Sequence, residues 1–255
     1  MIDWLFLLAV GIFVGFFGTL VGVGGGFILV PLLTLVYHLS PQYAVGTSLC
    51  IVALNALSGT VVYVQQKRID YRAGIYFGLA TLPGSFIGAY LLRYISASMF
   101  DIGFGVFLLF IATYMLTRKK IVSKAVTSTH TAAPHSYSLG LGIFISFFVG
   151  FFASIAGIGG GVIHVPAMIY LLKFSPFIAI PTSHFILAIS ATFAAASHSL
   201  IGEVEWMFLP FLGIGAVIGA QFGGKLSHKV ESIWLLRGLM IAMIFVAIRL
   251  IVKHL

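Results

Sequence analysis

A glycine-rich stretch occurs twice in this chain, each time inside a long apolar run. It reads GVGGGFILVP at residues 22–31 and GIGGGVIHVP at residues 157–166, a constant offset of 135 residues. Glycine lets the chain turn sharply and proline removes a backbone donor, so neither favours an uninterrupted helix. Each stretch therefore predicts a break in an apolar segment, and the same break is made twice.

The repetition extends beyond the glycines. With no gap in the offset, identical residues fall on one another along both halves of the chain: Ser40-Pro41 on Ser175-Pro176, Ala44 on Ala179, Thr47-Ser48 on Thr182-Ser183, Gly78 on Gly213, Gly84 on Gly219 and Gly88 on Gly223. We therefore predict two related units, residues 1–117 and 139–255, joined by the polar and basic linker 118–138.

Composition indicates the solvent around these units. Hydrophobic residues make up 60% of the 255 residues and charged residues only 8%, whereas a soluble protein carries about 25% charged residues. The chain is therefore predicted to be an all-α polytopic membrane protein.

Residues 1–17 have no basic leader and no small-residue cleavage pattern, so they are interpreted as the first membrane segment. A single cysteine, Cys50, excludes an intrachain disulfide and a cysteine-based zinc site.

Apolar runs of about 20 residues predict the helical segments, because the hydrocarbon core is about 30 Å thick and a helix rises about 1.5 Å per residue. Each unit contains five such segments, at 4–21, 26–37, 44–64, 73–92 and 98–117 and at 139–156, 161–172, 178–200, 206–226 and 232–252. The segments 26–37 and 161–172 are too short to cross unaided. We therefore predict eight to ten membrane segments, two of them short or broken at the glycine turns.

Loop charge predicts how the two units are oriented. An odd number of segments per unit places the second unit upside down relative to the first. The loop 65–74 carries Lys67, Arg68 and Arg72, whereas its counterpart 200–209 carries only Glu203 and Glu205. Positive loops stay in the cytoplasm, so 65–74 and the linker are predicted to lie inside and 201–205 outside. Alternation also places Arg118, Lys119, Lys120, Lys124, Lys173, Lys225, Lys229 and Arg237 inside, and Arg93, Arg249 and Lys253 outside.

This topology signal accounts for the net charge of +8, so no nucleic-acid partner is predicted. Inverted repeats are typical of secondary transporters, which bind substrate near the midplane at broken helices. Where a glycine turn begins a short helix, the free N–H groups and the positive dipole end favour an anion. We predict one anion site formed by Gly22, Gly24, Gly25, Gly26, Gly157, Gly159, Gly160 and Gly161. The alternative is that these glycines allow close helix packing.

Polar residues within the apolar segments are further candidates, because polar groups are costly inside a membrane. Thr47, Ser48 and Asn55 lie in the third segment, and Thr182 and Ser183 lie in the eighth. Hydroxyl and amide groups donate to anion oxygens without a permanent charge, so we assign these five residues to substrate binding. The alternative is that the hydroxyls bond to their own or a neighbouring helix.

His164, His184 and His198 all lie within apolar runs of the second unit. Because histidine titrates near physiological pH, we predict that at least one of them couples transport to protons. The alternative is that they are packing residues. The sequence predicts no metal site and no cofactor.

The same motifs carry a family resemblance. The pattern GxGGGxxxxP, a Ser-Pro turn, AVGTSL at 44–49 and RIDY at 68–71, largely repeated in the second half, resembles the sulfite exporter TauE/SafE family, also called the toluene-sulfonate uptake permeases. The resemblance implies transport of sulfur-containing anions such as sulfite, thiosulfate or organosulfonates across the inner membrane. The second copy departs from the first at IPTSHF, where Pro181 replaces Gly46 and His184 replaces Leu49.

We therefore expect a secondary transporter, not an enzyme, that exports a small sulfur-containing anion and binds only this substrate and the lipid bilayer. A passive anion channel is the nearer alternative. An intramembrane hydrolase using Ser183, His184 or His198 is disfavoured, because no orienting acid lies within an apolar run. The sequence leaves a homodimer open.

Overall fold

The computed structural model describes residues 3–117, 137–228, 230 and 232–252, with only the backbone of residues 117, 232–237, 239 and 242. The predicted linker 118–138 therefore lies almost entirely outside the described residues. The same holds for the charged side chains of Arg118, Lys119, Lys120, Lys124, Lys229, Arg237 and Lys253. Regular secondary structure in the described part of the chain is helical throughout.

Every predicted segment contains a helix. The first unit contains α1 (Trp4–Val21), α2 (Gly26–Leu35), α3 (Pro41–Gln65), α4 (Tyr71–Leu92) and α5 (Ala97–Thr117). The second contains α7 (Leu139–Ala156), α8 (Gly161–Tyr170), α9 (Pro176–Ile201), the 3-10 turn η1 (Trp206–Phe208), α10 (Leu209–Leu226) and α11 (Ser232–Val252). The all-helical fold is thereby confirmed.

Two predicted helix starts are wrong for the same reason. Helices α3 and α9 begin at Pro41 and Pro176, a few residues before the predicted starts at 44 and 178. The residues before them, Ser40 and Ser175, have extended backbone and occupy the N-cap positions without a side-chain hydrogen bond. Proline suits the first helical position, because its missing N–H has no partner there anyway. The Ser-Pro pairs therefore mark helix starts.

Seven helices in the described part are long and apolar enough to cross a membrane: α1, α3, α4, α5, α7, α9 and η1 with α10. Helices α2 and α8 have 10 residues each, which is about 15 Å. Because this is about half of the hydrocarbon thickness, these two helices are too short to span it, as predicted. The chain is a multi-pass membrane protein.

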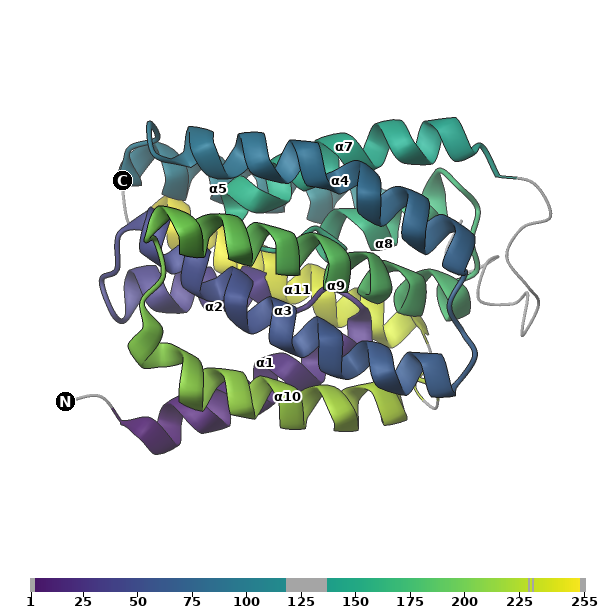
Figure 1. The fold of residues 1–255 in the computed structure, drawn as a ribbon, viewed down its shortest axis with the longest axis horizontal. Coiled ribbons are helices and arrows are strands. Elements are labelled where there is room, and N and C mark those ends of the chain that lie inside the picture. The colour runs from purple at the N-terminus through teal and green to yellow at the C-terminus, as the bar shows by residue number, and fades with distance from the viewer. Residues whose placement is uncertain (1–2, 118–136, 229, 231, 253–255) are drawn as a thin grey trace.

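Helices of the two units pack against each other in matching pairs. Helix α3 lies along α9 in the centre, α1 along α10 on one side and α4 along α7 on the other (Figure 1). Small residues let these backbones approach closely. A side chain at Gly84 would collide with the carbonyl oxygen of Phe147, and one at Gly219 with that of Ile12. These two contacts are related by the sequence offset.

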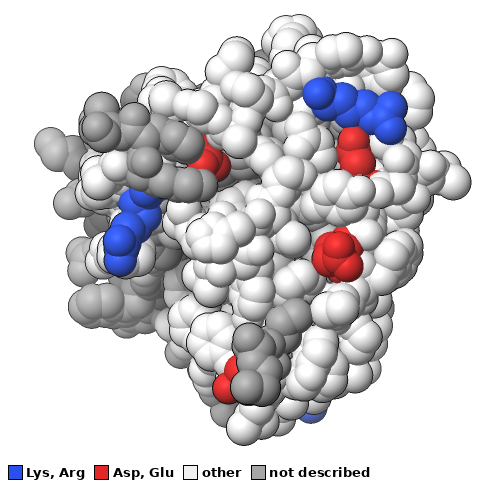
Figure 2. Space-filling model, turned by 90° about the vertical axis from the view of Figure 1, so that its left-hand side faces the viewer, with Lys and Arg blue, Asp and Glu red and all other residues white. Residues whose placement is uncertain are grey.

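The charged loops lie at opposite ends of the bundle. The segment 66–70, after α3, lies at the right-hand end of Figure 1, whereas 202–205, after α9, lies at the left-hand end. Figure 2 shows the left-hand end as a mostly uncharged surface with a few basic and acidic groups, one basic group lying directly beside an acidic one. Opposite ends are what opposite orientation of the two units requires. The sidedness in the membrane stays a prediction.

Candidate functional site

Two glycine turns separate α1 from α2 and α7 from α8. Six glycines in them have positive φ angles: Gly22 (82°), Gly24 (78°), Gly25 (83°), Gly157 (69°), Gly159 (67°) and Gly160 (97°). This left-handed conformation costs other residues about 1–2 kcal/mol each. Gly25 and Gly160 are the residues that precede α2 and α8. The glycines therefore allow a chain reversal between the two helices of each pair, at positions where other residues would favour continuation of the first helix.

The two turns touch each other through their backbones. A side chain at Gly26 would collide with the carbonyl oxygen of Gly157, and a Cβ atom on Gly161 would lie 2.6 Å from the carbonyl oxygen of Gly22. The contact is reciprocal, because the offset of 135 residues relates Gly26 to Gly161 and Gly22 to Gly157. The starts of α2 and α8 therefore lie beside the opposite turn.

Two buried serines tie the turns together. Ser48 on α3 donates its hydroxyl hydrogen to the carbonyl oxygen of Gly157 over 2.9 Å, and Ser183 on α9 donates to that of Gly22 over 3.2 Å. Each bond joins one unit to the other. Bonding to a neighbouring segment is thus the observed role of these hydroxyls, as one of the two sequence interpretations proposed.

The carbonyl groups of Gly24 and Gly159 are bonded within their own unit. Asn55 donates its amide N–H to the carbonyl oxygen of Gly24, and Ser190 donates to that of Gly159, both over 3.0 Å. The offset relates Ser190 to Asn55, although only Asn55 was assigned to substrate binding from the sequence. The side-chain carbonyl oxygen of Asn55, Oδ1, also accepts a hydrogen bond from the hydroxyl of Thr19 on α1 over 2.8 Å.

The two threonines bond to connecting segments instead of the turns. The hydroxyl oxygen of Thr47 accepts a hydrogen bond from the backbone N–H of Glu205, and that of Thr182 accepts from the N–H of Asp70, both over 2.9 Å. Each threonine thus holds the loop of the opposite unit over the start of its own helix. This position places the threonines near the two ends of the bundle.

Two aliphatic side chains occupy the space beside the turns. Val52 on α3 and Leu187 on α9, which are related by the offset, are both fully buried. A Cβ atom on Gly24 or on Gly159 would meet both of them. Val52 and Leu187 could not be selected from the sequence, because apolar residues are common throughout these helices.

The backbone N–H groups at the starts of the short helices are the unused donors of the site. None of the described residues accepts a hydrogen bond from the N–H groups of Gly25, Gly26, Phe27, Gly160, Gly161 or Val162. Such groups at a helix N-terminus form a favourable environment for an anion. Because the carbonyl groups of Gly22, Gly24, Gly157 and Gly159 already accept hydrogen bonds, these N–H groups are the donors that the junction offers to a ligand.

The three candidate histidines lie apart from one another. His164 on α8 has Nε2 3.1 Å from the hydroxyl of Ser146. His184 on α9 has Nε2 3.4 Å from the hydroxyl of Thr19 and packs edge-on against Tyr63. His198, near the end of α9, has Nδ1 2.9 Å from Glu203. The described residues include no group of three or more side chains suited to a metal ion.

Residues 7–250, nearly the whole chain, match the protein family described as Sulfite exporter TauE/SafE. The chain belongs to the sulfite exporter TauE/SafE family. The resemblance found in the repeated motifs is thereby confirmed.

Relatives of this TauE/SafE protein carry compatible names. Probable membrane transporter protein YunE of Bacillus subtilis is 32% identical over 268 residues, covering 98% of this chain and 97% of the relative. A probable membrane transporter protein of Methanocaldococcus jannaschii is 25% identical and covers 88% of this chain and 86% of the relative. No solved structure matches significantly. The TauE/SafE protein is therefore a membrane transporter of the cell membrane.

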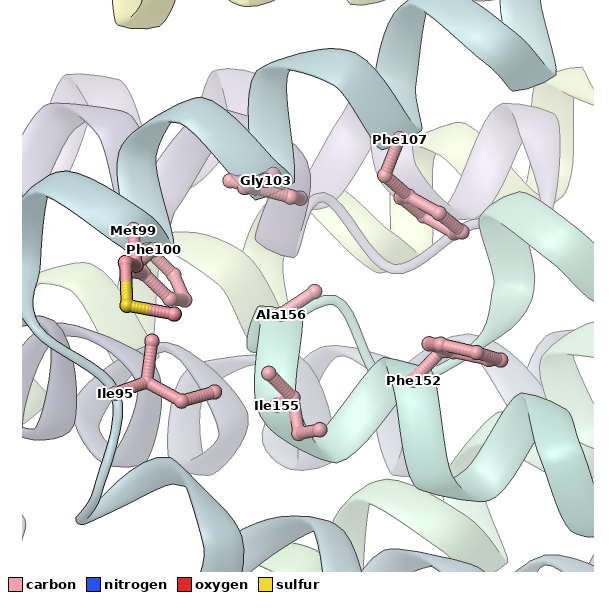
Figure 3. Close-up of a pocket in the computed structure, with 9 residues that line it drawn as sticks. Ile95, Met99, Phe100, Gly103, Phe107, Phe152, Ile155 and Ala156 are labelled. Carbon is pink, nitrogen blue, oxygen red and sulfur yellow. The ribbon is translucent and has the colours of Figure 1, made fainter.

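A pocket of about 220 Å³ lies beside the second turn of this TauE/SafE protein. Figure 3 shows it between α5, with Phe100, Gly103 and Phe107, and the end of α7, with Phe152 and Ala156. Its lining side chains are apolar. The pocket therefore offers no side-chain donor to an anion.

Proposed function

We propose that this protein is a secondary transporter that exports a small sulfur-containing anion, namely sulfite, thiosulfate or an organosulfonate, across the inner membrane. The observation that carries the proposal is the contact of the two glycine turns, where the unused N–H groups of two short helices lie. The turn residues 22–26 and 157–161 include no Lys or Arg. Partial charges from helix ends bind an anion without the strong hold of a full positive charge.

The polar side chains act on the site through the backbone. Asn55 bonds to the carbonyl oxygen of Gly24 and so orients the peptide group that carries the unused N–H of Gly25. Ser48 and Ser183 bond to the carbonyl oxygens of Gly157 and Gly22 and so hold the two turns in contact. Thr47 and Thr182 hold the segments 203–205 and 66–70 at the two ends of the bundle. We therefore assign these five residues to positioning of the turns and end segments instead of direct contact with the substrate.

The units 1–117 and 139–255 form an inverted repeat in this proposal, with the linker 118–138 in the cytoplasm. Reciprocal contacts support it: Ser48 with Gly157 matches Ser183 with Gly22, and Thr47 with Glu205 matches Thr182 with Asp70. An in-plane two-fold relation produces such pairs. It also brings the two broken helices together at the midplane.

Transport by conformational change is favoured over a passive anion channel. Val52 and Leu187 fill the space beside both turns, and residues 22–27 and 157–162 are all buried, so an anion reaches the N–H groups only after neighbouring side chains move. An open channel needs a continuous wet path at this depth. Flux of sulfite against its gradient in proteoliposomes distinguishes the two, because a passive channel cannot support it.

The anion site is tested by removing one N–H group. Val162→Pro does this at the second residue of α8 without breaking a helical hydrogen bond, since N–H groups of the first turn have no helical acceptor. Gly140→Pro makes the same change at the second residue of α7, where a Cβ atom would meet nothing within 4 Å. We expect sulfite flux to fall about tenfold only for Val162→Pro, because a hydrogen bond to a charged group contributes about 1.5–3 kcal/mol.

Unchanged flux in a monodisperse Val162→Pro protein would contradict the proposed site. Absence of flux for sulfite, thiosulfate and organosulfonates in the unmodified protein would contradict the substrate class.

A further inference from the structure

A buried acidic residue joins two basic side chains at the left-hand end of the bundle. The Oε1 atom of Glu203 accepts a hydrogen bond from Arg93 Nε over 3.1 Å, and its Oε2 atom lies 2.9 Å from His198 Nδ1. The side chain of Arg93 is 43% exposed, that of Glu203 10% and that of His198 0%. Glu203 therefore lies between the surface and an imidazole inside the helix bundle.

The far side of the imidazole has no bonded partner. The Nε2 atom of His198 is buried and makes no hydrogen bond of ordinary geometry, although the backbone of Ser154 on α7 lies beside the ring. The hydroxyl of Ser154 is also buried and without a partner. Buried polar atoms are nearly always bonded. His164 and His184 each have a buried Nδ1 atom without a partner as well, so the carboxylate on its other ring nitrogen is what distinguishes His198.

The equivalent positions of the first unit carry different chemistry. The offset relates Glu203, His198 and Ser154 to Arg68, Tyr63 and Thr19. Tyr63 donates its hydroxyl hydrogen to the carbonyl oxygen of Thr19 over 2.6 Å, so this ring is fully engaged.

Arg68 supplies a permanent charge at the right-hand end. Its guanidinium donates to the carbonyl oxygen of Phe177 and to the hydroxyl of Ser227. Burial lowers the pKa of Arg68, against a smaller opposite effect of Tyr63, yet a guanidinium remains charged at physiological pH. The same architecture therefore carries a fixed cation at one end and an acid–imidazole pair at the other.

We propose that Glu203 and His198 form a proton-binding site that is reached from the left-hand end of the bundle, the end predicted to face outward. Glu203, the more exposed of the two, receives the proton from water and passes it to the imidazole ring. The product is an imidazolium whose Nδ1–H is held by the Glu203 carboxylate, so one proton is bound and no other bond changes. Because this site would couple protons to anion movement, it rests on the proposed transport function.

The surroundings determine how this pair responds to pH. Arg93, at the end of α4, supplies a positive charge 3.1 Å from Glu203 on the side away from His198. Helix α3 contributes Cys50, whose sulfur lies 3.8 Å from the hydroxyl of Ser199. Helix α7 contributes the uncharged Ser154. Because Glu203 and His198 lie within hydrogen-bond distance, substitution of either residue changes the surroundings of the other.

His198 is favoured over the other two histidines by its contacts. Neither His164 nor His184 makes an ion pair within the described residues, and their recorded partners are the hydroxyl groups of Ser146 and Thr19. Only His198 therefore has both a carboxylate and, through that carboxylate, a connection to the surface.

The experiment uses the full chain in proteoliposomes loaded with thiosulfate, whose charge does not change near neutral pH. Thiosulfate flux and proton uptake are measured together for the unmodified protein, His198→Gln, Glu203→Gln and the control His38→Gln. His38 is exposed in the connection between α2 and α3 at the same end of the bundle. We expect His198→Gln and Glu203→Gln to lose proton uptake and the response of flux to a pH gradient, and His38→Gln to keep both.

A second readout needs no transport. In the detergent-purified protein with isotope-labelled histidines, the ring signal that disappears in His198→Gln should titrate with pH. The midpoint of that titration should shift in Glu203→Gln.

Proton uptake that persists in His198→Gln, or a His198 ring that does not titrate, would overturn the proton site. Thiosulfate flux without proton uptake in the unmodified protein would also overturn it and leave the transport proposal standing. If thiosulfate flux is absent, the ring titration still decides the proton site, whereas the transport proposal fails for thiosulfate.

Discussion

Ser48 on α3 donates its hydroxyl hydrogen to the carbonyl oxygen of Gly157, at the break between α7 and α8. This one bond fixes a crossing helix of the first unit to the glycine turn of the second. Its counterpart, from Ser183 to Gly22, fixes the second unit to the first. The pair holds the two turns in contact and so forms the junction at which we place the anion.

Removal of either serine hydroxyl should destabilise the fold. Ser48→Ala and Ser183→Ala each leave a buried turn carbonyl without its donor, at a cost of about 1–3 kcal/mol. The melting temperature in detergent should fall for both variants. Thr192→Ala is the control, because that hydroxyl bonds to Ala188 within its own helix. Equal melting temperatures for Ser48→Ala and Thr192→Ala would show that the bonds between units carry no special weight.

Leu187 should act as a barrier to passive flow. Leu187→Ala opens space beside both Gly24 and Gly159, and a buried Leu→Ala change costs about 2–5 kcal/mol of stability. We expect faster sulfite flux down its gradient and weaker accumulation against it. Leu108→Ala, at a fully buried position on α5, should lower stability without the leak. If Leu187→Ala does not increase passive sulfite flux, the barrier to passive flow lies elsewhere.

The predicted sidedness can be measured with single cysteines. In a Cys50→Ser background, Gly202→Cys should react with an impermeant thiol reagent on intact cells, whereas Gln65→Cys should react only after the cells are opened. Both positions are exposed, so access to each depends on the side of the membrane. Equal labelling of the two in intact cells would refute the inverted orientation.

His164 and His184 should act as packing residues. His164→Gln and His184→Gln remove contacts with Ser146 and Thr19, so we expect lower melting temperatures and an unchanged proton-to-thiosulfate ratio in proteoliposomes. A ratio that falls to zero in either variant would assign proton coupling to that histidine and not to His198.

The helices could be predicted well from the sequence, because a segment that crosses the hydrocarbon core must be apolar and long enough to span it. Apolar length alone marks a crossing segment, and glycine clusters mark the breaks, so α2 and α8 were recognisable as short helices. The offset also identified Ser48 and Ser183 as equivalent residues. These predictions depend only on composition and on spacing along the chain, and both can be read directly from the sequence.

The partners of the polar groups could not be predicted in the same way. Whether Thr47 faces a glycine turn or the loop at Glu205 depends on how α3 is rotated against its neighbours. Glu203 entered the sequence analysis only through the charge of its loop, because its contact with His198 forms where the chain folds back after α9. Such contacts depend on tertiary packing, to which helical periodicity gives no guide.

Anion binding at the glycine turns is tested most directly by crystallography with selenite in place of sulfite, because selenium gives an anomalous signal. We predict an anomalous peak within about 3.5–4 Å of the backbone nitrogens of Phe27 or Val162, with hydrogen-bonded oxygens between. Val52 and Leu187 should be displaced from their contacts beside Gly24 and Gly159. A peak found only elsewhere, for example beside Arg68 or Arg249, with both turns still closed, would contradict the site.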